Sequence, residues 1–223
     1  MEDKIIIINF KTYKEATGEN ALNLARICDD VATETNANIF IAPQFTDIFR
    51  IFSETNIPIF AQHVDNIEYG SNTGHILPES VKESGAIGSL VNHSERRLKL
   101  ADIEAIIGKL NKLDMASIVC TNNINTTKAV AALNPDFVAI EPPELIGTGI
   151  PVSKAKPEII EESVKAVEKI NPELRVLCGA GITTGEDVKR AIELGTCGVL
   201  VASGVVRAKN PRSALLDLVS GLM

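Results

Sequence analysis

The segment 141–149 holds the clearest candidate for acid–base chemistry in this chain. It reads Glu-Pro-Pro-Glu-Leu-Ile-Gly-Thr-Gly and directly follows the apolar run 137–140. The carboxylate of Glu141 would stand at the end of a buried strand, where it could act as a base. The glycines let backbone N–H groups approach an anion, and the prolines restrict the start of the loop. The pattern predicts a base beside a lid over a phosphate, with an ordinary glycine-containing turn as the alternative.

Polar residues also stand at the ends of other predicted strands. Asn9 and Lys11 follow the first strand, and His93 and Glu95 follow the fourth. Lys11 can bind an anionic substrate and stabilise developing negative charge, or it can be an ordinary solvated lysine. Glu95 can pair with Lys11 or with an arginine. In a barrel of parallel strands these groups would meet Glu141 around one mouth, because the strand ends converge on one face.

His93 lies in the segment 92–97, Asn-His-Ser-Glu-Arg-Arg, which is typical of a strand end that runs into a helical turn. The N-terminus of a helix presents N–H donors and the positive end of the dipole, and both disfavour imidazolium. The sequence therefore predicts a neutral hydrogen-bond donor at His93, with a structural histidine as the alternative. His63 and His75 lack such surroundings, so we interpret them as structural or interface residues.

Small residues follow the last two predicted strands. They read Gly-Ala-Gly at 179–181 and Ala-Ser-Gly at 202–204. Small side chains leave backbone N–H groups open to a phosphate, and barrels commonly bind phosphate after these two strands. This pattern indicates a phosphate-binding barrel and is compatible with many reactions.

The elements that position these residues alternate along the whole chain. Short apolar runs predict strands at 5–9, 39–42, 59–62, 88–92, 116–120, 137–141, 175–178 and 198–201. Amphipathic stretches predict helices at 20–34, 46–54, 78–84, 102–113, 126–133, 156–170, 185–194 and 211–222. Eight strands that alternate with eight helices favour a (β/α)₈ barrel, and a doubly wound open sheet is the alternative.

The composition limits the class of protein. A chain of 223 residues with 45% hydrophobic residues can form one large core, so we expect a single domain over 1–223. The net charge of −7 argues against binding to nucleic acid. The four cysteines are far apart and are expected to be buried thiols in a reducing compartment. Neither a signal peptide nor a membrane span is recognisable, which predicts a soluble, cytoplasmic protein.

Four separated motifs, which together span essentially the whole chain, closely resemble the triosephosphate isomerase family. They are Asn-Phe-Lys at 9–11, the segment 92–97, Glu-Pro with Ile-Gly-Thr-Gly within 141–149, and Cys-Gly-Ala-Gly at 178–181. The resemblance implies interconversion of dihydroxyacetone phosphate and D-glyceraldehyde 3-phosphate, a reaction of glycolysis and gluconeogenesis. It implies that Glu141 moves the proton, that neutral His93 polarises the carbonyl, and that Lys11 stabilises the enediolate. An acid–base pair with electrostatic help suffices, so neither metal nor cofactor is expected.

The resemblance also implies further site residues. Substrate would be bound by Asn9, Phe10, Lys11, Ile146, Gly147, Gly181, Ala202 and Ser203, with Glu95 in a supporting position. As a residue type, Phe10 is more plausibly a packing residue. Closure of the loop 142–152 would exclude water and prevent loss of phosphate from the intermediate.

Departures from the family's common pattern point to its archaeal-type branch. Pro143 and Glu144 stand where the common lid has Val-Trp. The segment 178–181 replaces Tyr-Gly-Gly-Ser, and Ala202 and Ser203 replace paired glycines. The proposed base, histidine and lysine are unaffected.

The stretch 61–75 resembles the family's protruding third loop, which inserts beside a neighbour's active site. Without the resemblance it would be a long polar surface loop. It implies a homodimer at minimum and, by analogy with the archaeal-type branch, a homotetramer. The rival interpretations are another phosphate-binding barrel, such as a ribose-phosphate isomerase or a thiamine-phosphate synthase, and a catalytically inactive sugar-phosphate sensor.

Overall fold

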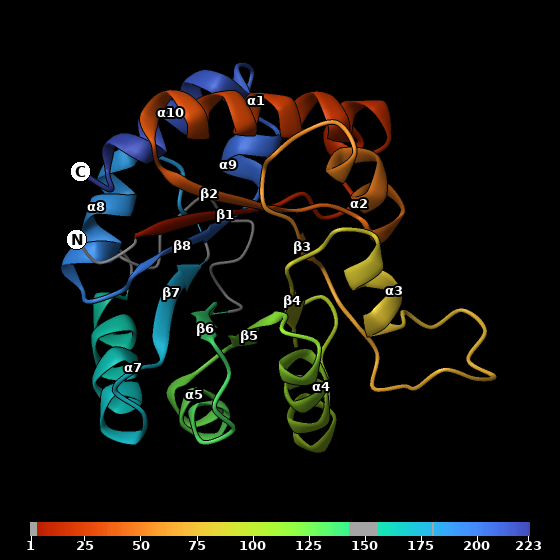
Figure 1. Cartoon of the computed structure of the whole chain (residues 1–223). Helices are drawn as coiled ribbons and strands as arrows, with labels where there is room; N and C mark the ends of the chain where they lie inside the picture. Colours follow the sequence, from red (N-terminus) through yellow and green to blue (C-terminus); the bar gives the residue numbers. More distant parts are fainter. Residues whose placement is uncertain (1–3, 143–155, 180) are drawn as a thin grey trace.

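Eight strands form one sheet in the computed structural model, which describes residues 4–142, 156–179 and 181–223 (Figure 1). The strands are β1 (Ile5–Asn9), β2 (Asn38–Ala42), β3 (Phe60–Ala61), β4 (Gly88–Val91), β5 (Ala116–Thr121), β6 (Phe137–Ile140), β7 (Arg175–Gly179) and β8 (Gly198–Val201). Each paired strand runs parallel to its neighbour. Every predicted strand is present, with ends that differ by at most one residue.

The sheet closes into a barrel. Its hydrogen-bonded order is β2-β1-β8-β7-β6-β5-β4-β3, so the two strands at its ends are β2 and β3. A parallel bridge between Ile41 and Ile59 brings these two ends together, and the amide of Ile41 donates to the carbonyl of Pro58 at 3.1 Å. Closure leaves no sheet edge exposed, which excludes the open doubly wound sheet. The predicted (β/α)₈ fold is confirmed.

Side chains alternate between the inside and the outside of the barrel. The buried cluster inside contains Ile5, Ile7, Ala42, Phe60, Leu90, Ile118, Cys120, Ala139, Leu177 and Leu200. Intervening strand residues such as Ile6, Ile8 and Val138 belong to a larger cluster between the strands and the helices. Both faces of each strand are therefore buried, which explains the continuous β-branched runs in the sequence.

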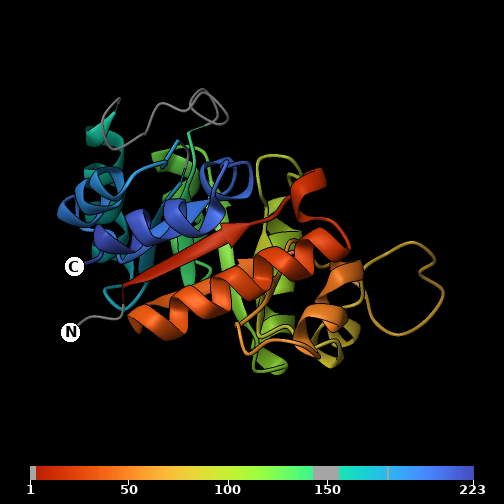
Figure 2. The same cartoon turned by 90° about the horizontal axis from the view of Figure 1, so that it is seen from above.

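The helices lie around the strands of the barrel (Figure 1), and Figure 2 shows the same arrangement from above. They are α1 (Glu19–Thr35), α2 (Phe45–Phe52), α3 (Pro78–Glu83), α4 (Leu100–Lys112), α5 (Ile124–Ala131), α7 (Pro157–Ile170), α8 (Gly185–Glu193), α9 (Ser203–Val206) and α10 (Pro211–Ser220), with the 3₁₀ turn η1 (Lys14–Ala16). The predicted helices are all present. The small residues that follow the last strand begin the short helix α9. In the described parts of the chain, no helix is both long and apolar enough to cross a membrane.

Three of the four cysteines are buried. Burial raises the pKa of the thiols of Cys28, Cys120 and Cys178, and nearby carboxylates raise it further. Their burial agrees with the prediction, and it keeps these thiols protonated at neutral pH. Cys197, which immediately precedes β8, departs from the prediction because it is only partly buried.

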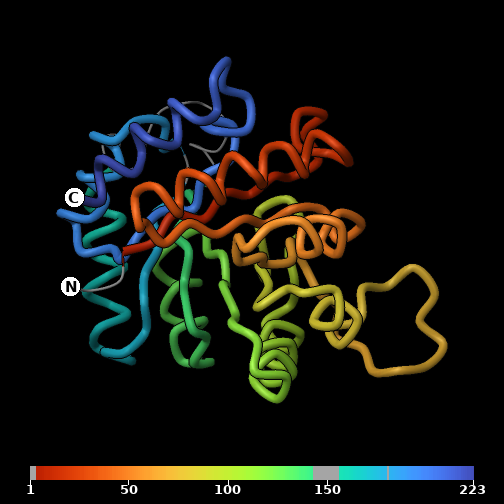
Figure 3. Tube along the Cα trace, turned by 45° about the horizontal axis from the view of Figure 1, so that its top comes forward, coloured from red at the N-terminus to blue at the C-terminus, as the bar shows by residue number. Residues whose placement is uncertain are grey.

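The segment 62–77 stands away from the barrel, between β3 and α3 (Figure 3). Asp65 fixes its base: the Asp65 amide donates to the carbonyl of Ile76 at 2.9 Å, and the Ile76 amide donates to Asp65 Oδ2 at 2.7 Å. The other carboxylate oxygen, Oδ1, contacts Nε2 of His63 at 2.9 Å and Arg96 at 3.1 Å. One carboxylate therefore joins both ends of the segment to the body of the protein.

The helix α8 begins with a capping box. The Thr184 hydroxyl accepts from the amide of Asp187 at 3.3 Å, while Asp187 Oδ2 accepts from the amides of Thr183 and Thr184 at 3.1 and 3.0 Å. These bonds satisfy N–H groups that lack partners in the first turn of a helix. They also hold the loop between β7 and α8 in one conformation.

We predict that Thr184→Ala lowers the free energy of unfolding by about 1 kcal/mol, because the hydroxyl acceptor of the helix cap is lost. Urea denaturation followed by circular dichroism measures this change. Thr184→Ser keeps the acceptor and is the matched control. Equal stability of the alanine and serine variants would contradict a capping role for Thr184.

Candidate active site

A cleft opens at the carboxyl ends of the strands. It is lined by Asn9, Lys11, Tyr13, His93, Glu141, Gly181, Ile182, Thr183, Leu200, Val201, Ala202, Ser203 and Gly204. These residues come from the ends of β1, β4, β6, β7 and β8 or from the loops that follow them. The cleft therefore brings together the polar strand ends and the small residues that the sequence analysis singled out, as expected for the functional face of a barrel.

Glu141 follows β6 and is only 5% exposed. Its amide donates to the carbonyl of Thr121 at 2.8 Å, which extends the pairing of β6 with β5 by one residue. It has the same parity along the strand as Phe137 and Ala139, so its side chain faces the barrel interior. Among the described residues, its Oε2 has no hydrogen-bond partner. A buried carboxylate oxygen without a partner is rare, and one that faces a cleft is suited to accept a proton.

His93 lies opposite Glu141. Its Nε2 is 3.5 Å from Glu141 Oε2, and both side chains are less than one-tenth exposed. The backbone amide of Glu95 donates to Nδ1 of His93 at 3.2 Å. An N–H directed at Nδ1 requires a lone pair there, which assigns the proton of the neutral ring to Nε2, on the cleft side.

The predicted reason for a neutral His93 was wrong. Residues 93–96 form a turn, in which the Arg96 amide donates to the His93 carbonyl at 2.8 Å, and the next helix, α4, begins only at Leu100, so His93 is not at a helix N-terminus. The N–H that meets Nδ1 comes from this turn, through the amide of Glu95. The N–H donor near the ring is therefore a single amide of a turn and not the first turn of a helix. The neutral form of His93 stays a prediction.

The environment favours the ionised form of Glu141. Burial by itself would raise the pKa of its carboxyl group. The polar contacts with His93 and the Cys120 thiol, together with the charge of Lys11, outweigh burial and bring the pKa below its ordinary value. Glu141 is therefore a carboxylate at neutral pH, which is the form that a general base requires.

Lys11 has a left-handed backbone, with φ of 48°. Such a conformation is uncommon for residues other than glycine and is found where the surroundings enforce it. Here the side chain of the buried Asn9 accepts from the Lys11 amide at 2.9 Å, and Gln62 donates to the Lys11 carbonyl at 2.9 Å. The Lys11 ammonium lies 3.0 Å from Glu95 Oε1. Asn9, Gln62 and Glu95 together hold the cation at the cleft.

The opposite side of the cleft is formed by two loops in close contact. Gly181 has φ of 76°, a conformation that glycine adopts readily. A Cβ atom on Gly204 would lie 2.9 Å from the carbonyl of Ile182, which shows how closely the second loop packs on the first. The first hydrogen bonds of α9 run from the amides of Val205 and Val206 to the carbonyl of Ala202. The amides of Ser203 and Gly204 precede those bonds, so they are suited to bind an anion.

Three residues predicted from the sequence to bind substrate are not part of this described geometry. Ile146 and Gly147, predicted to bind phosphate, lie outside the described residues. Phe10, predicted by resemblance to bind substrate, is fully buried in the core between barrel and helices and does not line the cleft. It has the outward parity of Ile6 and Ile8, so its side chain points away from the cleft. The packing role that its residue type suggested is the one that the structure shows.

Two supporting residues were not singled out from the sequence. Gln62 joins the ends of β1 and β2 by donating to the carbonyls of Lys11 and Ala42. Asn92 donates to the carbonyl of Cys120 at 2.9 Å and accepts from the amide of Leu98 at 2.9 Å, which holds the turn that contains His93. Both have amide side chains at the last residue of a predicted strand, and this position is the feature by which the sequence could have identified them. Within the described ranges, no cluster of histidine, cysteine and carboxylate side chains is suited to hold a metal ion.

Comparison with known proteins gives a consistent result. The family model described as triosephosphate isomerase matches residues 4–221. A triosephosphate isomerase from Methanobacterium bryantii is 61% identical over 98% of this chain and 97% of its own length. One from Methanothermus fervidus is 60% identical over 99% of both. The crystal structure of triosephosphate isomerase from Bartonella henselae has a TM-score of 0.73 and 19% identity, over 92% of this chain and 94% of that one, and it supports the fold.

The lowered pKa of Glu141 predicts a pH-dependent contribution to stability. The folded pKa is below the unfolded value of about 4.3, so the ionised carboxylate stabilises the fold above that pH, and the contribution is lost as the pH falls through the folded pKa. We expect the free energy of unfolding of wild type, minus that of Glu141→Gln, to be larger at about pH 6 than at about pH 3. Urea titrations at each pH measure it.

Glu104→Gln, at an exposed position of α4, is the matched control for loss of one carboxylate. The same pH trend in both variants would contradict a specific effect of the cleft on Glu141.

Proposed function

The chain belongs to the triosephosphate isomerase family, and on that premise we infer that it interconverts dihydroxyacetone phosphate and glyceraldehyde 3-phosphate. The observation that best supports a specific mechanism is the pairing of Glu141 and His93 across the cleft: Nε2 lies 3.5 Å from Oε2, and this oxygen accepts no hydrogen bond from the described residues. Lys11 lines the same cleft and supplies a positive charge.

The three side chains have complementary roles in this proposal. Glu141 removes a proton from the carbon beside the carbonyl, and the electron pair of the broken C–H bond forms the enediolate. His93 donates the Nε2 proton to the carbonyl oxygen and then takes a proton from the neighbouring hydroxyl, so its charge is unchanged at the end. Glu141 returns its proton to the former carbonyl carbon. The ammonium of Lys11 stabilises the negative charge of the intermediate, which is the largest electrostatic demand of the reaction.

The phosphate group has a suitable place on the far side of the cleft. Gly181, Ala202, Ser203 and Gly204 line this cleft together with Lys11 and His93, and they offer backbone N–H groups and the Ser203 hydroxyl. We propose that they bind the phosphate. By resemblance, the amides of Ile146 and Gly147 complete this site when the loop 142–152 closes, and closure excludes water from the enediolate.

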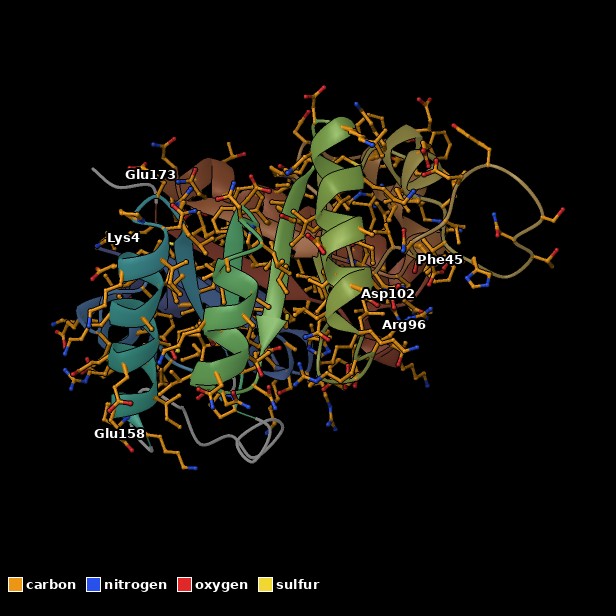
Figure 4. The ribbon with its side chains drawn as sticks, turned by 90° about the horizontal axis from the view of Figure 1, so that it is seen from below. Lys4, Phe45, Arg96, Asp102, Glu158 and Glu173 are labelled. Atoms are coloured by element: carbon orange, nitrogen blue, oxygen red, sulfur yellow. The ribbon has the colours of Figure 1, made fainter. Side chains whose placement is uncertain are left out.

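We also propose that the protein assembles at least as a homodimer, and by resemblance as a homotetramer. A second cleft adjoins the first and shares Asn9, Lys11 and His93 with it, and its lining also includes Phe45 and Ile76. Phe45 and Phe49 on α2 are 53% and 63% exposed. Figure 4 places Phe45 and Arg96 on the side from which the segment 62–77 protrudes. Exposed aromatic side chains beside a pinned, projecting segment are typical of a protein–protein interface.

Further proposals follow from the same family membership. We propose that residues 1–223 function as one barrel domain, because one sheet includes all the described strands. We propose a cytoplasmic location, since Cys28, Cys120 and Cys178 are sequestered thiols that suit a reducing compartment.

We predict that Glu141→Asp lowers kcat by at least about 10²-fold, because the shorter side chain withdraws the carboxylate from the position of the reacting proton. The measurement is a coupled assay of glyceraldehyde 3-phosphate turnover with a metal chelator present. Glu104→Asp, on the surface of α4, is the matched control and should turn over like wild type. A chelator-sensitive wild type, or equal activity of the two aspartate variants, would contradict the mechanism. Binding of triose phosphate without turnover by wild type would favour a sugar-phosphate sensor.

We predict that Phe45→Asp reduces the mass of the assembly in light scattering at micromolar concentration, because a charge in an apolar interface opposes association. Met223→Asp is the control, since Met223 is 95% exposed and does not line the second cleft. A monomeric mass for the wild type would refute the assembly.

A further inference from the structure

Gly179 ends β7 on the inward-facing side of the barrel. Its strand neighbour Leu177 belongs to the cluster inside the barrel, and residues two apart on a strand share a face. β7 pairs with β6, and Ile140 is opposite Cys178 in their register. A side chain at 179 would therefore project inward beside the end of β6, where Glu141 begins.

The space that a side chain at 179 would need is filled by the proposed base. A Cβ atom built on Gly179 would lie 2.7 Å from Cγ, 3.3 Å from Cδ and 3.2 Å from Oε1 of Glu141. Separations under 3.0 Å are not tolerated between such atoms, so one of the two groups must move. Because Gly179 has no Cβ atom, the side chain of Glu141 can lie directly against the backbone of β7.

Gly179 differs in this respect from other strand glycines. A Cβ on Gly88 would meet the carbonyl oxygen of Ala116 at 2.4 Å, and one on Gly198 would meet the carbonyl oxygen of Ile5 at 2.1 Å. Those glycines are required by close packing of the barrel backbone. The three nearest atoms around a Cβ on Gly179 all belong to one side chain, Glu141. The requirement at 179 therefore concerns the position of a functional group.

We propose that Gly179 is a positioning residue for the isomerase reaction, which sets the place of the Glu141 carboxylate by leaving it room against β7. The proposal rests on the proposed role of Glu141 as base. A methyl group at 179 displaces Cγ of Glu141, and the carboxylate then leaves its position opposite Nε2 of His93 and beside the Cys120 thiol. Substrate binding through Lys11 and the phosphate loops is not affected directly.

The test is Gly179→Ala in the full-length protein. We expect kcat to fall by about 10²-fold, the size of effect that a displacement of about 1 Å produces, with KM changed less than about threefold. Displacement of the Glu141 carboxylate also removes the contacts that lower its pKa, so this group becomes protonated at a higher pH in the variant than in wild type. The ratio of kcat/KM, variant to wild type, should therefore decrease further between about pH 8 and about pH 5, and titration of the substrate cancels in this ratio.

Gly195→Ala is the matched control for a destabilising glycine substitution outside the cleft. Gly195 has φ of 94° after α8, and a Cβ there would meet Val164 at 3.1 Å. This variant should have a lower Tm than wild type but the same kcat and the same pH profile. A normal kcat for Gly179→Ala, or a loss of kcat shared equally by Gly195→Ala, would overturn the proposal.

A thermal-unfolding cycle tests the contact without reference to the reaction. In wild type, Gly179→Ala should lower Tm by about 2–4 °C, and in a Glu141→Ala background it should lower Tm by less than about 1 °C. Equal losses in both backgrounds would show that the added methyl group acts on something other than Glu141. If wild type is inactive but the Tm changes are as expected, the proposed function is refuted and the contact between positions 179 and 141 is supported. Failure of the proposed function can therefore be distinguished from failure of the positioning role.

Discussion

The alternation of side chains along eight parallel strands is the constraint on which the site depends. Closure of the sheet through Ile41 and Ile59 makes every strand face the same interior. On β6 the alternation turns Glu141 inward, and on β7 it turns Gly179 toward the same point. A shift of one residue in either strand would exchange these groups with Ile140 or Cys178, which pack against the helices. The apolar packing of the barrel thus decides which groups can take part in chemistry.

A buried carboxylate is costly, and its surroundings show how the cost is offset. Glu141 is 5% exposed, yet its ionised form is favoured by His93, by the Cys120 thiol and by the charge of Lys11. These contacts leave Oε2 without a hydrogen bond within the described part of the structure. Complete pairing would stabilise the charge further but would leave no lone pair for a substrate proton. The contacts around Glu141 are therefore sufficient to keep the carboxylate ionised, and they leave its Oε2 atom able to accept a proton.

Much of this arrangement could be predicted from the sequence, and the exceptions have physical causes. The strands were predictable because both of their faces are buried, which produces unbroken apolar runs. A helix terminus was predicted at His93, but the N–H that faces its Nδ1 is the Glu95 amide in a turn, since periodicity does not reveal where one N–H in a turn points. Phe10 was grouped with the substrate residues by resemblance, although alternation from Ile6 already placed it outside the barrel. The close contact of Gly179 with Glu141 depends on distances between strands, which sequence patterns do not contain.

The projecting segment 62–77 has a further consequence because of how its base is held. Asp65 joins its two ends within each chain, through Ile76 on one side and His63 on the other. The conformational entropy of ordering this base is therefore lost during folding, before any second subunit is met. In the proposed assembly, a partner subunit would meet a segment whose base is already ordered, so less of the association free energy would be needed to order it. Tyr69 lies in the same segment, is 74% exposed and is not among the partners of Asp65, so its substitution would leave the hydrogen bonds of the base in place.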